Sequence, residues 1–329
     1  MKNRRKRPEM RRRLRHERRL EQMILKGSAL FSLTVIAVRV CGMRAAMLAG
    51  IAALTALLTQ AVCLRVRKKA PDLSLPQAML DGVILLMLMP VSVPVSLLII
   101  SCIFAIIISN FRIKNDSAPV VPAAPAGYCL AWLVNRSGVM LFPASAGHLP
   151  LFSIDRSLLT EGLSADWNRS WKFPPNPVDW IIGLRGLPLG SCSLFLLLVI
   201  AAVFLIRGAA SPYVFIPMLL PLIPAYMLFT FMRFPVRAAA AALMTNQLLF
   251  SALFIYGDSD FAPPGIAGIL FGLMTASGFL WMQRHFSSGV LWTAVLLGLI
   301  AALLRNVMRN ERKKRRRSRR ADKEKAAPA

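Results

Sequence analysis

The stretch Asn176–Ser193 reads NPVDWIIGLRGLPLGSCS and stands directly before a long apolar run. Its three glycines, Gly183, Gly186 and Gly190, argue against an ordinary membrane helix, because glycine permits backbone conformations that other residues rarely adopt. Uncovered N–H groups near the start of a helix can bind a phosphate or another anion. Two interpretations of the stretch stay open, an anion-binding re-entrant loop and a loop whose glycines only pack tightly.

The composition is that of an integral membrane protein. Of the 329 residues 56% are hydrophobic and the mean hydropathy is +0.55, whereas soluble proteins contain about 45–50% apolar residues. The formal charge of +26 is concentrated at the ends, since 12 of the 41 Lys and Arg residues lie in residues 1–26 and another 12 in residues 305–329. Neither basic tail interleaves aromatic residues with its arginines, which argues against nucleic-acid binding. The positive-inside rule predicts instead that both termini are cytoplasmic, beside anionic lipid headgroups.

Hydropathy predicts an all-α polytopic membrane protein with about ten transmembrane helices, because an even number returns both termini to one side. The transmembrane domain covers residues 27–304, between the basic tails 1–26 and 305–329. An extracytoplasmic loop over residues 143–180 leads into the re-entrant glycine stretch, residues 181–190. The other apolar segments include Ser28–Met43 and Ala46–Leu64 around a short turn at Arg44, then Ala126–Phe142, Ser191–Ile206, Tyr213–Phe231, Val236–Tyr256, Ile266–Met282 and Val290–Leu304.

Prolines interrupt the apolar pattern at two corresponding places. Pro90 and Pro94 break one run and leave a half-helix, Val83–Met89, too short to span a bilayer of about 30 Å. The sequence FIYGDSDFAPPG, residues 254–265, interrupts a second run. Broken helices at matching positions are typical of inverted repeats with a central binding site, so we expect two inverted five-helix halves.

Few ionisable residues lie in or beside the apolar body, and each is a functional candidate because intramembrane charge is costly. Asp81 and Asp258 stand at the two interruptions and are the preferred pair for a cation or proton path; a structural role at helix ends is the alternative. The sequence contains no hydrolase triad, P-loop or dinucleotide motif, and its five cysteines and three histidines have no metal-binding spacing. The full set of such residues is Arg39, Asp81, Asp179, Arg185, Arg207, Asp258, Asp260 and Arg284.

The order of these features resembles a family of membrane subunits that includes the RnfD-type subunit of Rnf electron-transport complexes and the NqrB-type subunit of the sodium-translocating NADH:quinone reductase. The resemblance covers most of residues 79–304. Four stretches carry it, LMLMPVSVPVSLLIISCIFAIII, VPAAPAGYCLAWL, DWIIGLRGLPLGSCSLFLLL and the segment from ALFIYGDSDFAPPG to LLGL. It implies a ten-span subunit of an ion-coupled redox complex that works with other membrane subunits.

The resemblance also implies FMN, joined through its phosphate to a threonine in a Ser-Gly-Ala-Thr-like motif. At the matching place this chain reads TEGLSADWN, where Ser164 is retained and Asp166 stands in place of the threonine. Because a carboxylate repels a phosphate, we expect no covalent attachment. Non-covalent FMN then remains as the alternative, at Gly183, Gly186, Gly190 and Ser191 with Arg185 as the phosphate partner.

Three functions follow from the sequence. The first is a divergent membrane subunit of an ion-coupled electron-transport complex without covalent FMN. The second is a transporter or channel on the same architecture, with its substrate site at the broken helices. The third is a membrane scaffold without chemistry, whose basic tails bind anionic lipid or an acidic partner.

Overall fold

The computed structural model describes residues 2–68, 73–111, 121–143, 150–152, 157, 159–161, 188–222, 224, 247–258, 261–283, 291–298, 300 and 307. For residues 2–16, 160, 161 and 283 it describes the backbone only. Within these ranges the chain is helical apart from turns and one small hairpin.

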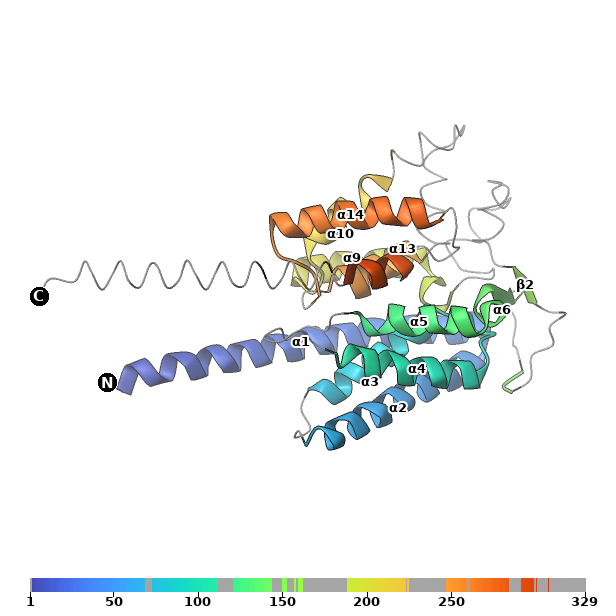
Figure 1. The fold of residues 1–329 in the computed structure, drawn as a ribbon, viewed down its shortest axis with the longest axis horizontal. Coiled ribbons are helices and arrows are strands. Elements are labelled where there is room, and N and C mark those ends of the chain that lie inside the picture. The colour runs from blue at the N-terminus through green and yellow to red at the C-terminus, as the bar shows by residue number, and fades with distance from the viewer. Residues whose placement is uncertain are drawn as a thin grey trace, which may run out of the picture.

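The apolar segments of the N-terminal half form the first helix group. It consists of α2 (Met43–Val66), α3 (Ser74–Met87), α4 (Val95–Ser109) and α5 (Ala123–Val134). Helix α2 packs against α3 and α4, and α4 packs against α5. Before this group runs α1 (Lys2–Cys41), a continuous helix whose N-terminal part projects beyond the other helices (Figure 1).

The second helix group is built from the C-terminal half. It contains α9 (Leu194–Arg207), α10 (Pro212–Leu219), α13 (Leu248–Ser251) with the π-helical segment η3 (Ala252–Tyr256), and α14 (Ile266–Gln283). Helix α10 packs against α14, and residues 291–298 are also helical. Helix α1 contacts α2 and α3 on one side and α9 on the other, so it lies between the two groups (Figure 1).

The short elements lie at the end of the bundle opposite the projecting part of α1. They are α6 (Arg136–Met140), strands β1 (Leu141–Pro143) and β2 (Leu159–Glu161), and the 3₁₀ turn η2 (Leu189–Ser191). The two strands pair antiparallel, and Phe142 lies opposite Thr160. We call this end of the bundle the hairpin end and the end from which α1 projects the basic end (Figure 1).

Helix lengths in the described part of the chain differ widely. Two helices, Glu17–Cys41 and Met43–Val66, are long and apolar enough to cross a membrane, and five shorter apolar helices accompany them. Helix α3 has 14 residues, which is about 21 Å at 1.5 Å per residue and less than the roughly 30 Å hydrocarbon core. The sequence predicted a half-helix over residues 83–89 before Pro90, whereas α3 begins nine residues earlier and ends two residues earlier.

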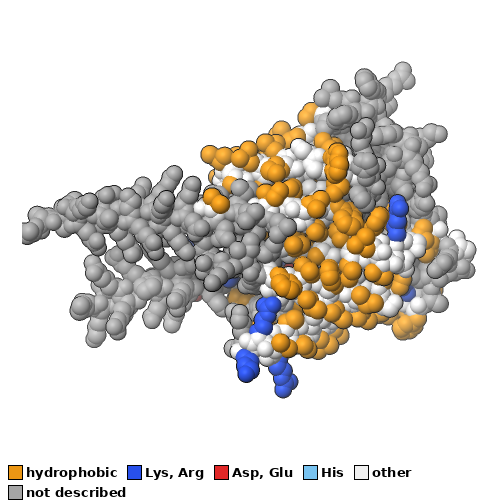
Figure 2. Space-filling model, viewed as in Figure 1, with side chains coloured by type: hydrophobic (Ala, Val, Ile, Leu, Met, Phe, Trp, Pro, Cys, Tyr) orange, Lys and Arg blue, Asp and Glu red, His pale blue; other side chains and the backbone are white. Residues whose placement is uncertain are grey.

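Apolar side chains cover the outside of the bundle as well as its interior. Large hydrophobic residues are exposed on α2, α4, α9 and α14, including Leu58, Ile107, Phe195 and Leu270. Figure 2 shows hydrophobic side chains over much of the visible face, with Lys and Arg only near its margins. An apolar surface of this extent is stable in lipid and would be unusual on a soluble monomer.

Two predicted boundaries are wrong. The turn after the first span is at Gly42, whose φ of 84° favours glycine, and Arg44 lies in the first turn of α2 with its side chain buried. The predicted span Ala126–Phe142 is interrupted, because Asn135 leaves the helical conformation and its side-chain oxygen accepts a hydrogen bond from the Gly138 N–H at 3.0 Å. The all-α prediction likewise omitted the β1–β2 hairpin.

Other predictions agree with the described residues or lie beyond them. The predicted span Ile266–Met282 corresponds to α14, and Ser191–Ile206 corresponds to α9, which begins three residues later. The predicted breaks lie at opposite ends of the bundle, residues 88–94 beside the hairpin and the described residues 257, 258 and 261–265 at the basic end. Most of the loop 143–180, residues 181–187 of the glycine stretch and most of the tail 305–329 lie outside the described residues.

Candidate functional site

Asp81 and Asp258 come close together although 177 positions separate them in the sequence. Asp81 lies on α3, in the first helix group, and Asp258 lies in the turn after η3, in the second group. The two carboxylates interact electrostatically with each other and with the ammonium group of Lys26. Three ionisable side chains from three elements therefore form one cluster, which we call the charged cluster.

Lys26 makes the closest contact in the charged cluster. Its Nζ lies 2.8 Å from Asp258 Oδ1, and the side chains are 7% and 17% exposed. Asp81 accepts a hydrogen bond from Gln77 Nε2, one helical turn earlier, at 3.4 Å. A buried ion pair is costly to desolvate. The presence of the Lys26–Asp258 pair among apolar helices therefore indicates that a requirement other than the burial of apolar surface maintains it.

Backbone contacts within the second helix group, between the turn after α9 and the turn after η3, fix the position of Asp258. The Ser211 N–H donates to the Gly257 carbonyl at 2.7 Å, and Ala210 pairs with Asp258 in a short antiparallel bridge. Gln22 on α1 donates to the Gly208 carbonyl at 3.3 Å. The turn that follows η3 is thus tied to the turn that follows α9 and, through Lys26, to α1.

The structure revises two features of the sequence interpretation. Asp81 lies inside regular α3, six residues before its last residue Met87, and not at the interruption itself. Lys26 was assigned to the basic tail, yet it is buried in the bundle. The available signal was that Lys26 follows Ile24 and Leu25 inside the apolar part of α1, away from the other basic residues of the tail.

The carboxyl end of α3 meets the second helix group in the interior. Gln247 Nε2 donates to the Leu88 carbonyl at 2.6 Å, and the Leu189 N–H donates to the Met89 carbonyl at 3.2 Å. Gln247 Oε1 and Ser251 Oγ are buried and have no hydrogen-bond partner among the described residues. These two neutral oxygens lie one turn apart at the start of α13, so the interior between the helix groups contains acceptors as well as charges.

Gly190 and Ser191, two of the residues predicted to bind FMN, are packed into this same region. A Cβ at Gly190 would lie 2.8 Å from the Phe250 ring and 2.9 Å from Met87 Cβ. Ser191 is 1% exposed, and its N–H donates to the Pro188 carbonyl at 2.9 Å. The described residues of the glycine stretch therefore pack tightly and do not form a phosphate cradle, so we derive no chemistry from FMN there.

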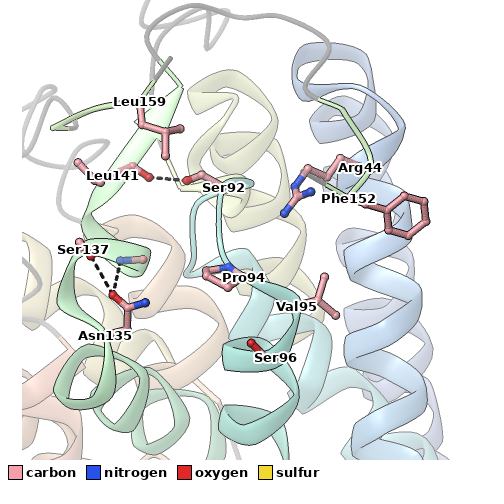
Figure 3. Close-up of a pocket in the computed structure, with 11 residues that line it drawn as sticks. Arg44, Ser92, Pro94, Val95, Ser96, Asn135, Ser137, Leu141, Phe152 and Leu159 are labelled. Atoms are coloured by element: carbon pink, nitrogen blue, oxygen red, sulfur yellow. Dashed lines mark hydrogen bonds between the residues drawn. The ribbon is translucent and has the colours of Figure 1, made fainter. Parts of the chain in front are cut away.

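A separate cavity of about 380 Å³ opens at the hairpin end (Figure 3). Arg44 on α2 and Ser92 in the turn 88–94 line one side, and Asn135 and Ser137 line another. Ser92 Oγ donates a short hydrogen bond to the Leu141 carbonyl, and Ser137 Oγ donates to Asn135 Oδ1 at 2.8 Å. Phe152 also lines the cavity, and its exposed ring points away from Ser92 and Asn135 (Figure 3).

Arg44 is 1% exposed, and backbone carbonyls hold its guanidinium group. Nε donates to Val91 at 2.9 Å, one terminal nitrogen donates to Val93 at 3.2 Å, and the other donates to Pro150 at 3.3 Å and to Leu151 at 2.5 Å. Four hydrogen bonds occupy most of its five N–H donors. Arg44 therefore fixes the turn 88–94 and the loop near Leu151, and little of its donor capacity remains for a ligand.

Several other candidates from the sequence take no part in these sites. Arg39 and Arg207 are exposed on α1 and α9. The remaining predicted residues lie outside the described part of the chain; they are Ser164, Asp166, Asp179, Gly183, Arg185, Gly186, Asp260 and Arg284.

The apolar exterior, the two helix groups and the buried charges together define a helical, multi-pass integral membrane protein. The chain belongs to the NQR2, RnfD, RnfE family, whose family model matches residues 6–314. The comparison with curated proteins finds none that matches. The protein is accordingly a membrane subunit of the family of ion-translocating redox complexes, and membership implies that it assembles with other subunits of such complexes. This confirms the resemblance drawn from the four sequence stretches.

Proposed function

We propose that this chain is the membrane subunit of an ion-coupled electron-transport complex in which Asp81 and Asp258 lie on the path of the translocated cation. The observation that carries the proposal is the charged cluster, where carboxylates from the two helix groups and the buried Lys26 come together among apolar helices near the basic end. Carboxylates at membrane depth are costly and typically mark ion or proton pathways.

Neutral oxygens between the helix groups support the same proposal. Gln247 Oε1 and Ser251 Oγ are buried acceptors at the start of α13, beside the carboxyl end of α3. The carboxyl end of a helix carries partial negative charge and favours a cation. A cation that left the charged cluster toward the hairpin end would meet these groups next.

The proposal is tested with the chain in its complex, reconstituted into liposomes and supplied with an electron donor. Sodium uptake is followed with radioactive Na⁺, and proton uptake with a pH-sensitive dye inside the liposomes. We expect Asp81→Asn and Asp258→Asn each to reduce coupled uptake by about tenfold or more, because an amide cannot supply the negative charge that compensates the cation. Glu21→Gln, an exposed carboxylate change on α1, should leave uptake unchanged.

The outcomes separate the candidate functions. Uptake that requires the electron donor and fails in both aspartate variants supports the redox-coupled path. Uptake without any donor, again lost in both variants, would instead favour a transporter or channel on this architecture. Full coupled uptake in both variants would remove the charged cluster from the ion path and leave a scaffold role.

The orientation and cofactor state form part of the proposal. Both termini face the cytoplasm, where the basic tails lie beside anionic lipid headgroups, as the positive-inside rule predicts. FMN is not covalently attached, because Asp166 replaces the threonine that the family motif supplies. The support for these statements is the sequence, since residues 162–187 lie outside the described chain.

A further inference from the structure

Lys26 occupies the position where the proposed path would receive a cation. Its Nζ is 2.8 Å from Asp258 Oδ1 and its side chain is 7% exposed. An ammonium group at this distance supplies the positive charge and the N–H donors that a carboxylate accepts. Lys26 therefore already provides Asp258 with what an arriving cation would provide.

Lys26 also interacts electrostatically with Asp81, while the two carboxylates repel each other. In a low-dielectric interior such interactions are much stronger than in water. A positive charge that reaches Asp258 would therefore repel the ammonium group of Lys26 and change how strongly Asp258 holds it.

The position of Lys26 in the fold suits an exchange of partners. Helix α1 contacts α3, which carries Asp81, and α9, whose following turn pairs with the turn that carries Asp258. The lysine side chain has a flexible four-carbon stem and three rotatable donors. Its ammonium group can therefore leave Asp258 without movement of the helix.

We propose that Lys26 is an internal counter-cation that competes with a translocated monovalent cation for Asp258. While the path is empty, Lys26 pairs with Asp258, as in the structure. A cation that binds at Asp258 displaces the ammonium toward Asp81, so Lys26 sets the cation affinity of the path. This inference rests on the proposed function and assigns a role to a residue outside the predicted site.

The experiment measures protection of Asp258 by sodium ions in the intact complex. Dicyclohexylcarbodiimide, which enters membranes and modifies protonated carboxyl groups, is applied at increasing NaCl with choline chloride to hold ionic strength constant. Modification of Asp258 is quantified by mass spectrometry of its peptide. We expect Lys26→Met to lower the sodium concentration for half-protection by about tenfold, because a competing charge has been removed. Lys26→Arg, which keeps the charge, should stay within about twofold of the unmodified protein.

Matched variants separate competition from a structural role. Ser28→Ala, two residues after Lys26, removes an exposed hydroxyl that donates to the Leu25 carbonyl of the same helix, so it should not change half-protection. If Lys26→Met does not assemble, Lys26→Gln keeps a donor toward Asp258 without the charge, and the same shift is expected.

Two other outcomes would contradict either the role of Lys26 or the proposed ion path. Sodium protection that is equal in Lys26→Met and the unmodified protein, together with loss of uptake in Asp258→Asn, overturns the role of Lys26 and leaves the proposed path intact. Absence of sodium protection in every variant, with normal uptake in Asp258→Asn, overturns the path and the inference together.

Discussion

At the residue scale, the described part of the bundle buries two cationic side chains, Lys26 and Arg44, which have different partners. Lys26 pairs with a carboxylate from the second helix group, whereas Arg44 is held by four backbone carbonyls. A planar guanidinium group suits the second task, because its N–H groups diverge in a fixed fork that several carbonyls can share. Arg44 therefore acts as a structural cross-link at the hairpin end.

The first residue-scale prediction concerns this cross-link. Arg44→Ala should lower the thermal unfolding midpoint of the purified protein by several degrees, since unpaired buried carbonyls cost about 1–3 kcal/mol each. The measurement is intrinsic fluorescence during heating in detergent. Arg39→Ala removes an exposed arginine three residues before the Gly42 turn and serves as the control. Equal midpoints for the two variants would contradict the cross-link.

Arg44 and Lys26 also show the limit of sequence interpretation at this scale. Hydropathy counts both as charges at the margin of an apolar run, because it assigns each residue a value without regard to distant neighbours. Their partners lie 47 or more positions away in the chain. The prediction that Asp81 and Asp258 act together needed no such distance information, since both stood beside matching interruptions of the pattern.

At the element scale, α3 is the helix on which the site depends, because it carries Asp81 and ends in the interior. Its length is limited by Pro90, and its close approach to α2 is set by Gly82, next to Asp81. A Cβ at Gly82 would lie 2.6 Å from the Ala52 carbonyl oxygen and 2.7 Å from Ala56 Cβ. Small residues at such contacts let membrane helices pack closely.

Substitution of Gly82 should therefore separate α3 from α2. We expect Gly82→Ala to destabilise the protein by about 1–3 kcal/mol, the usual cost of overpacking, seen as a lower thermal midpoint in detergent. Gly50→Ala on α2 is the matched control, because no atom lies within 4 Å of the added Cβ and alanine favours a helix. A midpoint for Gly82→Ala at or above that of the control would show that the two helices do not touch there.

The sequence predicted these elements unevenly. The uniform apolar run Ile266–Met282 predicted α14 well, and the prolines predicted the short α3. Asn135 was not recognised as a helix end, because its capping of α6 depends on backbone geometry that residue counts do not contain. The hairpin was missed for a similar reason, since its strands have three residues each and are separated in the chain by residues 144–158 of the polar loop.

At the scale of the whole molecule, the two helix groups and the helix between them are consistent with a membrane subunit that works beside redox partners. The family implies such partners. Among the residues predicted to bind FMN, Gly190 packs against Phe250 and Met87, whereas Gly183, Arg185 and Gly186 lie outside the described residues. Flavin binding by this chain is therefore tested on the purified protein.

Denaturing electrophoresis answers that question directly. We expect no flavin fluorescence in the band of this chain after boiling in detergent, because Asp166 cannot form the phosphoester that a threonine forms. Addition of free FMN before boiling provides the control for removal of non-covalent flavin. A fluorescent band that survives in the unspiked sample would show that the chain holds flavin covalently through another residue.

Helix α1 has one more consequence. It runs from Lys2 to Cys41 without interruption, so Lys2 and Lys26 belong to one continuous helix and lie about 36 Å apart along its axis at 1.5 Å per residue. A tilt of the N-terminal end of α1 would therefore be transmitted along the helix to the ammonium group that pairs with Asp258.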